Sequence, residues 1–334
     1  MDIRLDIEDE NQPTKSATST RKNEKGFALS SFNEFEISKA IAKLGSQGRP
    51  LILPIGFPGA GKSLLLSSLF WYAQLGRETL FSIERRGDKN EANQQGDGYF
   101  VNGKNVVDQM VTTFSRGSLY ERNAVGSLDL IGVDIIPSKH KSSPVKFPRL
   151  PLSFIDLSGE DIKKIKTSEG GEFSSKINAI FKGVQLESSP MIFFLITPFD
   201  PRRDSGQTIE DAHRNEDFLH YDFLNHINTN QPQLLKNSLF IIIVSQWDKN
   251  NTYDGAEDFI REKRKSIYGF VKNSTVVWGE YSVGNILQNE VNGIIHEEIL
   301  NRNEDYPSRL WKMIYKICTK RDLDHKTIWQ KLFS

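Results

Sequence analysis

The sequence predicts an α/β protein with a mostly parallel sheet, one antiparallel hairpin strand and helices on both faces. Apolar runs alternate with helical patterns along most of the chain, which is typical of parallel sheets covered by helices. Two consecutive apolar runs break the alternation, because only a Lys/Ser/Pro-rich loop joins them. That loop has no room for a crossover helix, so these two strands should pair as an antiparallel hairpin.

Six apolar runs are the expected strands, and the second and third of them should form the hairpin. They are Pro50–Ile55, Leu128–Ile136, Leu150–Leu157, Met191–Thr197, Leu239–Ser245 and Thr275–Tyr281.

Apolar residues at helical spacing predict the helices between these strands. The expected helices are Ser63–Leu75, Glu172–Leu186, Glu210–Ile227 and Glu257–Phe270. An earlier helix should carry the apolar residues from Phe32 to Leu44 and end at Gly45 and Gly48, because glycine commonly follows the last helical turn.

One domain, residues 27–334, is expected to follow a tail. Residues 1–26 are polar and charged, and this composition predicts disorder. The stretch 87–127 is rich in Gly, Asn and Gln and then in Ser and Arg, which we interpret as a mobile insertion. A C-terminal helical tail is expected from about residue 320.

The charge balance and the cysteine content indicate which partners and which cellular compartment to expect. Basic and acidic residues number 43 each, so no bulk attraction to nucleic acid or to an anionic membrane is expected. Cys318 is the only cysteine, which rules out an intramolecular disulfide and is typical of a reducing compartment. No run of 18 apolar residues and no secretion signal are present, so we expect a cytoplasmic protein without a transmembrane segment.

A glycine-rich segment between the first strand and the next helix predicts a phosphate site. Residues 56–63 read Gly-Phe-Pro-Gly-Ala-Gly-Lys-Ser and match the P-loop pattern G-x-x-x-x-G-K-[ST]. In such a loop, backbone N–H groups and the helix N-terminus hold the phosphates of a nucleoside triphosphate. The expected nucleotide-binding residues are Gly56, Pro58, Gly59, Ala60, Gly61, Lys62 and Ser63. Lys62 should reach the β- and γ-phosphates as a catalytic residue, and the Ser63 hydroxyl should bind Mg²⁺. A glycine-rich turn without a ligand is the alternative.

A second motif follows the third expected strand. Asp156 to Gly159 reads Asp-Leu-Ser-Gly, a D-x-x-G pattern at the C-terminal edge of that strand. We expect Asp156 to hold Mg²⁺, directly or through water, and the Gly159 N–H to meet the γ-phosphate. A threonine or serine before the hairpin should sense the γ-phosphate, and the sequence does not choose among Thr112, Thr113, Ser115 and Ser118.

A base-reading segment is predicted where the fifth strand ends in Ser-Gln-Trp-Asp-Lys, residues 245–249. Guanine presents N1–H and N2–H side by side, and one carboxylate can accept both, whereas adenine offers no such pair. Asp248 is the expected acceptor, and the stem of Gln246 should pack on the base. An ordinary acidic loop after a core strand is the alternative.

The order of these motifs resembles the TRAFAC class of GTPases, the Ras- and translation-factor-related P-loop NTPases. The last strand ends in Ser282, Val283 and Gly284, which is similar to the short segment whose backbone contacts guanine in that class. The resemblance implies a Ras-like fold and Mg²⁺-dependent hydrolysis of GTP to GDP. It also implies loops that couple the nucleotide state to a protein partner. It places Glu160 where Ras-like GTPases carry the residue that orients the attacking water.

The chain departs from the family's [NT]-K-x-D pattern, because Ser245 and Gln246 replace its first two residues. The absence of the family's lysine at position 246 should affect the affinity for the nucleotide more than the preference for guanine. The segment 305–311, Asp-Tyr-Pro-Ser-Arg-Leu-Trp, is similar to one in bacterial double-GTPases of conflict and signalling systems. That resemblance implies action beside another gene product, in defence against phage.

Two other functions remain open from the sequence. One is an ATPase or another P-loop NTPase, which is favoured if Asp248 lies away from the base. The other is a nucleotide-bound scaffold without hydrolysis, which Pro58 inside the loop and Glu160 in the water-orienting slot both favour.

Two groups of residues are given ordinary roles. We expect His213, His220 and His226 to be surface or interface histidines, because further zinc ligands are absent from the sequence around them. Arg202 and Arg203 follow a strand end, where an arginine finger in cis is conceivable, but we interpret them as loop charges.

Overall fold

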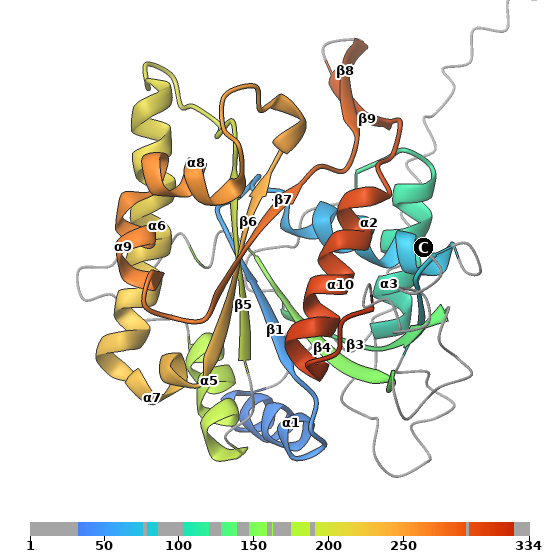
Figure 1. The fold of residues 1–334 in the computed structure, drawn as a ribbon, viewed down its shortest axis with the longest axis vertical. Coiled ribbons are helices and arrows are strands. Elements are labelled where there is room, and N and C mark those ends of the chain that lie inside the picture. Colours follow the sequence, from blue (N-terminus) through green and yellow to red (C-terminus); the bar gives the residue numbers. More distant parts are fainter. Residues whose placement is uncertain are drawn as a thin grey trace, which may run out of the picture.

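The computed structural model describes residues 33–75, 79–85, 103–119, 128–138, 147–158, 162, 175–187, 191–291 and 294–323. These residues form an α/β fold around a seven-stranded sheet of order β2-β3-β4-β1-β5-β6-β7 (Figure 1). A separate two-stranded sheet, β8-β9, projects from one side of the main body (Figure 1). The predicted tail 1–26 lies outside the described residues, as does the end of the chain from 324 onward.

The strands of the main sheet agree with the six predicted apolar runs within one residue and add a new edge strand, β2. They are β1 Leu51–Ile55, β2 Phe81–Arg85, β3 Leu128–Pro137, β4 Leu150–Leu157, β5 Met191–Pro198, β6 Ser238–Ser245 and β7 Val276–Tyr281. Strands β4, β1, β5, β6 and β7 pair in parallel, whereas β3 is antiparallel to both β2 and β4. The predicted hairpin of β3 and β4 is therefore confirmed.

Helices cover both faces of the sheet, as predicted. They are α1 Glu34–Ser46, α2 Lys62–Gln74, α3 Gly103–Ser115, α5 Ser175–Glu187, α6 Ile209–Asn230, α7 Pro232–Lys236, α8 Ala256–Lys263, α9 Lys265–Val271 and α10 Asp305–Thr319. Residues of α1 and of α5 to α9 share one buried cluster, and residues of α2, α3 and α10 share the other. The strands send alternate side chains into the two clusters, as the period of a strand requires.

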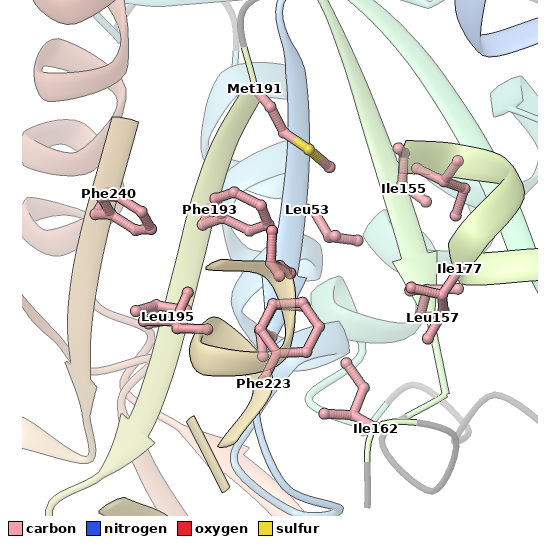
Figure 2. Packing of buried hydrophobic residues seen from close by; sticks show 14 of the residues in the cluster. Leu53, Ile155, Leu157, Ile162, Ile177, Met191, Phe193, Leu195, Phe223 and Phe240 are labelled. Carbon is pink, nitrogen blue, oxygen red and sulfur yellow. The ribbon is translucent and has the colours of Figure 1, made fainter. Parts of the chain in front are cut away.

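Aromatic side chains fill the first cluster behind β1 and β5. Phe193 on β5 stacks on Phe240 of β6 with ring centroids 5.6 Å apart, and it meets the ring of Phe223 edge-on at 6.1 Å. Figure 2 shows these rings beside Leu53 and Leu195. These side chains pack β1, β5, β6 and the long helix α6 together.

Part of the stretch interpreted as a mobile insertion is a packed helix. Residues 103–115 form α3, and its Val107, Met110 and Phe114 are buried in the second cluster against α2. These three positions follow helical spacing. The stretch was nevertheless interpreted from its overall composition, which is dominated by the surrounding Gly, Asn and Ser residues. The rest of that stretch, outside 103–119, lies beyond the described residues.

The predicted helix Glu257–Phe270 is two helices, because Arg264 leaves the helical conformation with φ −133° and ψ 54°. The fully buried Arg264 side chain then reaches back to the end of β5, where its Nε donates to Thr197 Oγ1 at 2.8 Å. Asp217 on α6 accepts from the backbone N–H groups of Ser266 and Ile267 and so holds the new helix start. The tertiary hydrogen bonds of the buried Arg264 side chain therefore interrupt a helix that the apolar spacing predicted to be continuous.

The described strands also include a hairpin that was not predicted from the apolar runs. Strand β8, Asn285–Val291, pairs antiparallel with β9, Ile294–Leu300, and Ser118 after α3 forms a bridge with Glu298. Among the described helices, none combines the length and the apolar character needed to cross a bilayer.

Candidate functional site

A cavity of about 1030 Å³ lies at the C-terminal edge of the parallel strands, where open α/β sheets bind their ligands. The loops after β1, β4, β5, β6 and β7 all contribute to its wall. Its lining includes residues 58–65, Leu157, Ser158, residues 200–203, Ser245, Gln246, Asp248, Lys249, Tyr281, residues 283–286 and Glu297. Segments separated by more than two hundred residues in the sequence therefore share one site.

Gly56 and Gly59 show two different reasons why the glycine loop, residues 56–63, requires glycine. A Cβ added at Gly56 would lie 2.6 Å from the carbonyl oxygen of Ile196 on β5, so the loop passes too close to that strand for a side chain. Gly59 has φ +90°, which L-residues with a side chain rarely adopt. The loop ends at the first turn of α2, where no side chain caps the helix N–H groups. Those donors are thus left for a ligand at the cavity wall.

A lysine that faces phosphates is expected to be solvated, but Lys62 lines the cavity with only 7% of its surface exposed. Its Nζ donates to the carbonyl oxygens of Gly56 at 2.9 Å and of Phe57 at 3.3 Å. The glycine loop therefore folds around its own lysine, because a buried ammonium group needs acceptors. Ser63, the next residue, lies in the same wall.

Two carboxylates face each other at the end of the β3–β4 hairpin. Asp156 is 1% exposed, and its register partner across the hairpin is Asp129. Directly paired residues point to the same face of a sheet, so the two acids lie side by side. Neither belongs to the cavity wall, although Leu157 and Ser158, which follow Asp156 directly, do. Burial raises the pKa of the Asp129 carboxyl above its usual value. No sequence motif pointed to Asp129, although the register of the hairpin places it opposite Asp156.

Several residues expected near the γ-phosphate are not brought to the cavity or lie outside the described residues. Gly159 and Glu160 belong to the latter group, so their predicted roles stay predictions. The four candidate sensors are absent from the cavity wall, which instead contains Leu119 at the end of that segment. They are Thr112, Thr113, Ser115 and Ser118. No group of three or more His, Cys, Asp and Glu side chains with metal-binding geometry occurs within the described part of the chain.

Asp248 lies in the short 3₁₀ turn Trp247–Lys249 that follows β6, and it lines the cavity. The hydroxyl of Ser282, after β7, donates to Asp248 Oδ1 at 2.6 Å. The same hydroxyl accepts from the backbone N–H of Gly284 at 3.3 Å. Ser282 therefore sets the orientation of the carboxylate, while Val283 lines the cavity itself.

Ser245 joins the glycine loop to the Asp248 segment. Its hydroxyl is buried and donates to the carbonyl oxygen of Ala60 at 3.0 Å. Gln246 follows with φ +60°, and its half-buried side-chain Oε1 has no hydrogen-bond donor among the described residues. The Ser245–Ala60 hydrogen bond thus holds the glycine loop directly to the segment that carries Asp248. Gln246, which is uncharged, follows Ser245 in that segment.

The loop after β5 lines the cavity between the glycine loop and the segment that carries Asp248. Asp200 accepts a 2.9 Å salt bridge from Lys249, and the backbone N–H of Phe199 donates to the Ser245 carbonyl oxygen at 2.8 Å. Arg202 and Arg203 follow in the cavity wall. This loop is therefore tied to the Asp248 segment at its start.

A buried polar cluster lies behind the glycine loop and corrects the expectation of surface histidines. The ring of His220 is fully buried, with its nitrogens 2.9 Å from the Glu216 carbonyl oxygen and 3.4 Å from that of Ile55. His213 is also buried, and its Nδ1 lies 2.7 Å from Arg264 Nη1. Burial lowers the pKa of each histidine to about 4, so both rings are neutral near pH 7. They are structural residues on the inner face of α6.

Glu216, in the same cluster, has a carboxyl group whose Oε2 is buried without a hydrogen-bond donor among the described residues. Burial raises its pKa to about 7, although the positive charges of Arg264 and Lys62 oppose this shift. The helix that supports the glycine loop thus carries a carboxyl group that titrates near neutral pH.

No protein-family model matches this chain, and no curated protein sequence is significantly similar to it. The assignment of a function therefore depends on the cavity and on the residues that line it.

Proposed function

We propose that this protein binds GTP with Mg²⁺, hydrolyses it to GDP and acts as a nucleotide-state switch for a protein partner. One observation carries the proposal: the glycine loop and Asp248 line a single cavity, and the Ser245–Ala60 hydrogen bond joins them. The volume of this cavity, about 1030 Å³, lies at the upper end of the usual range for ligand sites, and a cavity of that size can hold a whole nucleoside triphosphate.

The phosphate end of the proposed site is supported by the glycine loop and the start of α2. Backbone N–H groups of an uncapped helix start and the Lys62 ammonium group are the donors that a triphosphate needs. The hydrogen bonds of Lys62 to Gly56 and Phe57 keep the ammonium group in place until phosphate oxygens replace the two carbonyls.

Mg²⁺ suits the oxygen donors at this end. Ser63 offers a hydroxyl at the cavity wall, and Asp156 is a buried carboxylate directly before the lining residues Leu157 and Ser158. Mg²⁺ prefers such hard donors, completed by water and phosphate oxygens, and it needs few protein ligands. When bound, the ion would neutralise charge that develops on the β- and γ-phosphates. Glu160 remains our candidate for orienting the attacking water.

The base end of the proposed site is supported by Asp248 and Ser282. With Oδ1 held by the Ser282 hydroxyl, the carboxylate presents a fixed edge to the cavity, and N1–H and N2–H of guanine match that edge. Adenine would leave the carboxylate unpaired. Each lost hydrogen bond to a charge costs about 1.5–3 kcal/mol, so two predict a preference for guanine of roughly 10²–10⁴.

A switch needs a surface that meets both the nucleotide and a partner, and the β8–β9 hairpin is suited to this. Ile286 and Glu297 line the cavity, while Ile286, Leu287 and Leu300 leave about 40% of their surface exposed. The hairpin projects beside α3 and α10 (Figure 1). Exposed apolar side chains on a projecting element are typical of sites that bind other proteins.

The proposal is tested by calorimetric titration of the purified protein with GTP, ATP and xanthosine triphosphate, each with Mg²⁺. We expect GTP to bind at least 10²-fold more tightly than ATP. The variant Asp248→Asn should lose affinity for GTP and gain affinity for the xanthine nucleotide, whose C2 substituent accepts a hydrogen bond. Equal binding of GTP and ATP would instead support an ATPase, and GTP binding without phosphate release would support a non-hydrolysing scaffold.

A further inference from the structure

Arg202 is a cation in the cavity wall that no other described residue neutralises. Its side chain forms no ion pair or hydrogen bond within the described residues, in contrast to Lys249, which pairs with Asp200. It passes directly over the glycine loop, because a Cβ added at Gly59 would lie 3.3 Å from both Cδ and Nε of Arg202. A positive charge without a partner, in contact with a glycine of the loop, is thus available to a ligand.

The start of the loop that carries Arg202 is held firmly. Its first residue, Phe199, packs edge-on against Trp247 with ring centroids 5.9 Å apart and lies 5.1 Å from the ring of Phe259. The Asp200–Lys249 salt bridge and a backbone hydrogen bond to Ser245 add to this packing. The position of Arg202 is therefore set by the same segment that carries Asp248.

The order of the strands decides which part of a nucleotide Arg202 would meet. The glycine loop follows β1, the Asp248 segment follows β6, and β5 lies between these two strands. Asp156, our candidate Mg²⁺ ligand, lies near the C-terminal end of β4, on the far side of β1. A nucleotide that extends from Asp248 to the glycine loop thus passes the loop after β5 with its ribose and its α- and β-phosphates. Its γ-phosphate would point toward β4, away from Arg202.

Gln246, in the same cavity wall, supplies no cation. It stands where the GTPase pattern has lysine, it carries no charge, and its Oε1 lacks a donor among the described residues. We propose that Arg202 holds the α- and β-phosphates of the guanine nucleotide. This inference rests on the proposed function.

A group that contacts the α- and β-phosphates meets GTP and GDP alike. Its loss should therefore weaken both nucleotides equally and raise KM, whereas kcat should stay nearly unchanged. An arginine that stabilises the transition state at the γ-phosphate behaves differently, because its loss lowers kcat and leaves GDP affinity intact. The two roles of an arginine in this cavity can thus be separated by experiment.

The experiment measures GDP and GTP affinity by calorimetry, and KM and kcat by phosphate release, in four proteins. They are the wild type, Arg202→Ala, Arg202→Lys and Arg214→Ala. Arg214 is the matched control, because it is an exposed arginine on α6 outside the cavity. We expect Arg202→Ala to weaken both nucleotides about 5- to 50-fold, with kcat within about twofold of the wild type. Arg202→Lys should recover part of the loss, and Arg214→Ala should bind as the wild type does.

Three outcomes would overturn the assignment of Arg202. They are an unchanged affinity for GDP with a reduced kcat, unchanged affinity for both nucleotides, and an equal loss in Arg214→Ala. The variant Arg203→Ala extends the test, since a loss found there and not in Arg202→Ala would give the role to the neighbouring arginine. A wild type that binds neither nucleotide would refute the proposed function itself, whereas a binding wild type with an unaffected Arg202→Ala refutes only this inference.

Discussion

The Ser282 hydroxyl donates a 2.6 Å hydrogen bond to Asp248 Oδ1, across a separation of 34 residues in the sequence. Ser282 is almost completely buried, whereas the Asp248 side chain reaches into the cavity. The bond connects the segments that follow β6 and β7, two neighbouring parallel strands. A carboxylate held in this way presents one fixed edge to a ligand, which is how a protein selects between bases.

Replacement of Ser282 should weaken selection of the base. In Ser282→Ala the Asp248 carboxylate loses its donor and can rotate, so we expect GTP affinity to fall about 5- to 20-fold and the GTP/ATP preference to narrow. Calorimetric titration with both nucleotides measures this change. Ser274→Ala, an exposed serine before β7, is the control and should leave both affinities as they are. A GTP/ATP preference that survives in Ser282→Ala would show that the hydrogen bond does not matter for base choice.

Replacement of Lys62 should abolish nucleotide binding and leave the fold intact. The Lys62 ammonium group bonds to carbonyls of its own loop, so Lys62→Ala removes the charge without opening the core. We expect GTP affinity to fall by at least about 100-fold, because a charge-assisted contact to two phosphates is lost. The unfolding temperature should change little, as it should in the surface control Lys265→Ala. Undiminished GTP binding by Lys62→Ala would contradict a phosphate role for the glycine loop.

Two glycine-to-alanine substitutions should have opposite effects on stability. In Gly56→Ala the new Cβ would lie 2.6 Å from the Ile196 carbonyl oxygen, so the loop must shift, at a cost of about 1–3 kcal/mol in unfolding free energy. A Cβ added at Gly269, in helix α9, would have no neighbouring atom within 4 Å. Gly269→Ala should therefore stabilise the protein by up to about 1 kcal/mol. Urea unfolding measures both values. If Gly56→Ala were as stable as the wild type, the close approach of the loop to β5 would be disproved.

Stability should respond to the titration of Glu216. Burial raises its folded pKa to about 7 from 4.5, so between these values the folded protein holds a proton that the unfolded chain has released. The contribution of this carboxyl to stability therefore falls as pH rises from 4.5 through 7. Glu216→Gln stays neutral throughout, and near pH 8 its advantage over the wild type should be roughly 3 kcal/mol larger than near pH 4.5.

Urea unfolding of both proteins at pH 5 and pH 8 measures this difference for Glu216. His213 and His220 titrate in the opposite sense, because their folded pKa values of about 4 make stability fall as pH drops from 6.5. Both proteins contain them, so their contributions cancel when the variant is compared with the wild type. A difference between the two proteins that is the same at both pH values would mean that Glu216 titrates normally.

By itself, the sequence determined the elements whose signals are local. Apolar runs of strand length predicted the strands β1, β3, β4, β5, β6 and β7 within a residue, and the short β3–β4 connection predicted their antiparallel pairing. The spacing of glycine, lysine and serine in residues 56–63 predicted a loop between a strand and a helix, because that backbone conformation needs those residue types. Helix α3 was missed, because polar neighbours diluted its apolar spacing in the composition.

Tertiary structure alone decided which side chains from distant segments meet. Periodicity indicates which face of α6 is covered but not by what, so the contacts of His213 with Arg264 and of His220 with the Ile55 carbonyl oxygen could not be foreseen. The same holds for the contact of Arg202 with Gly59 and for the Ser282–Asp248 hydrogen bond, because each depends on where two separate loops leave neighbouring strands. Strand order and register set those positions, and they arise only when the whole sheet is assembled.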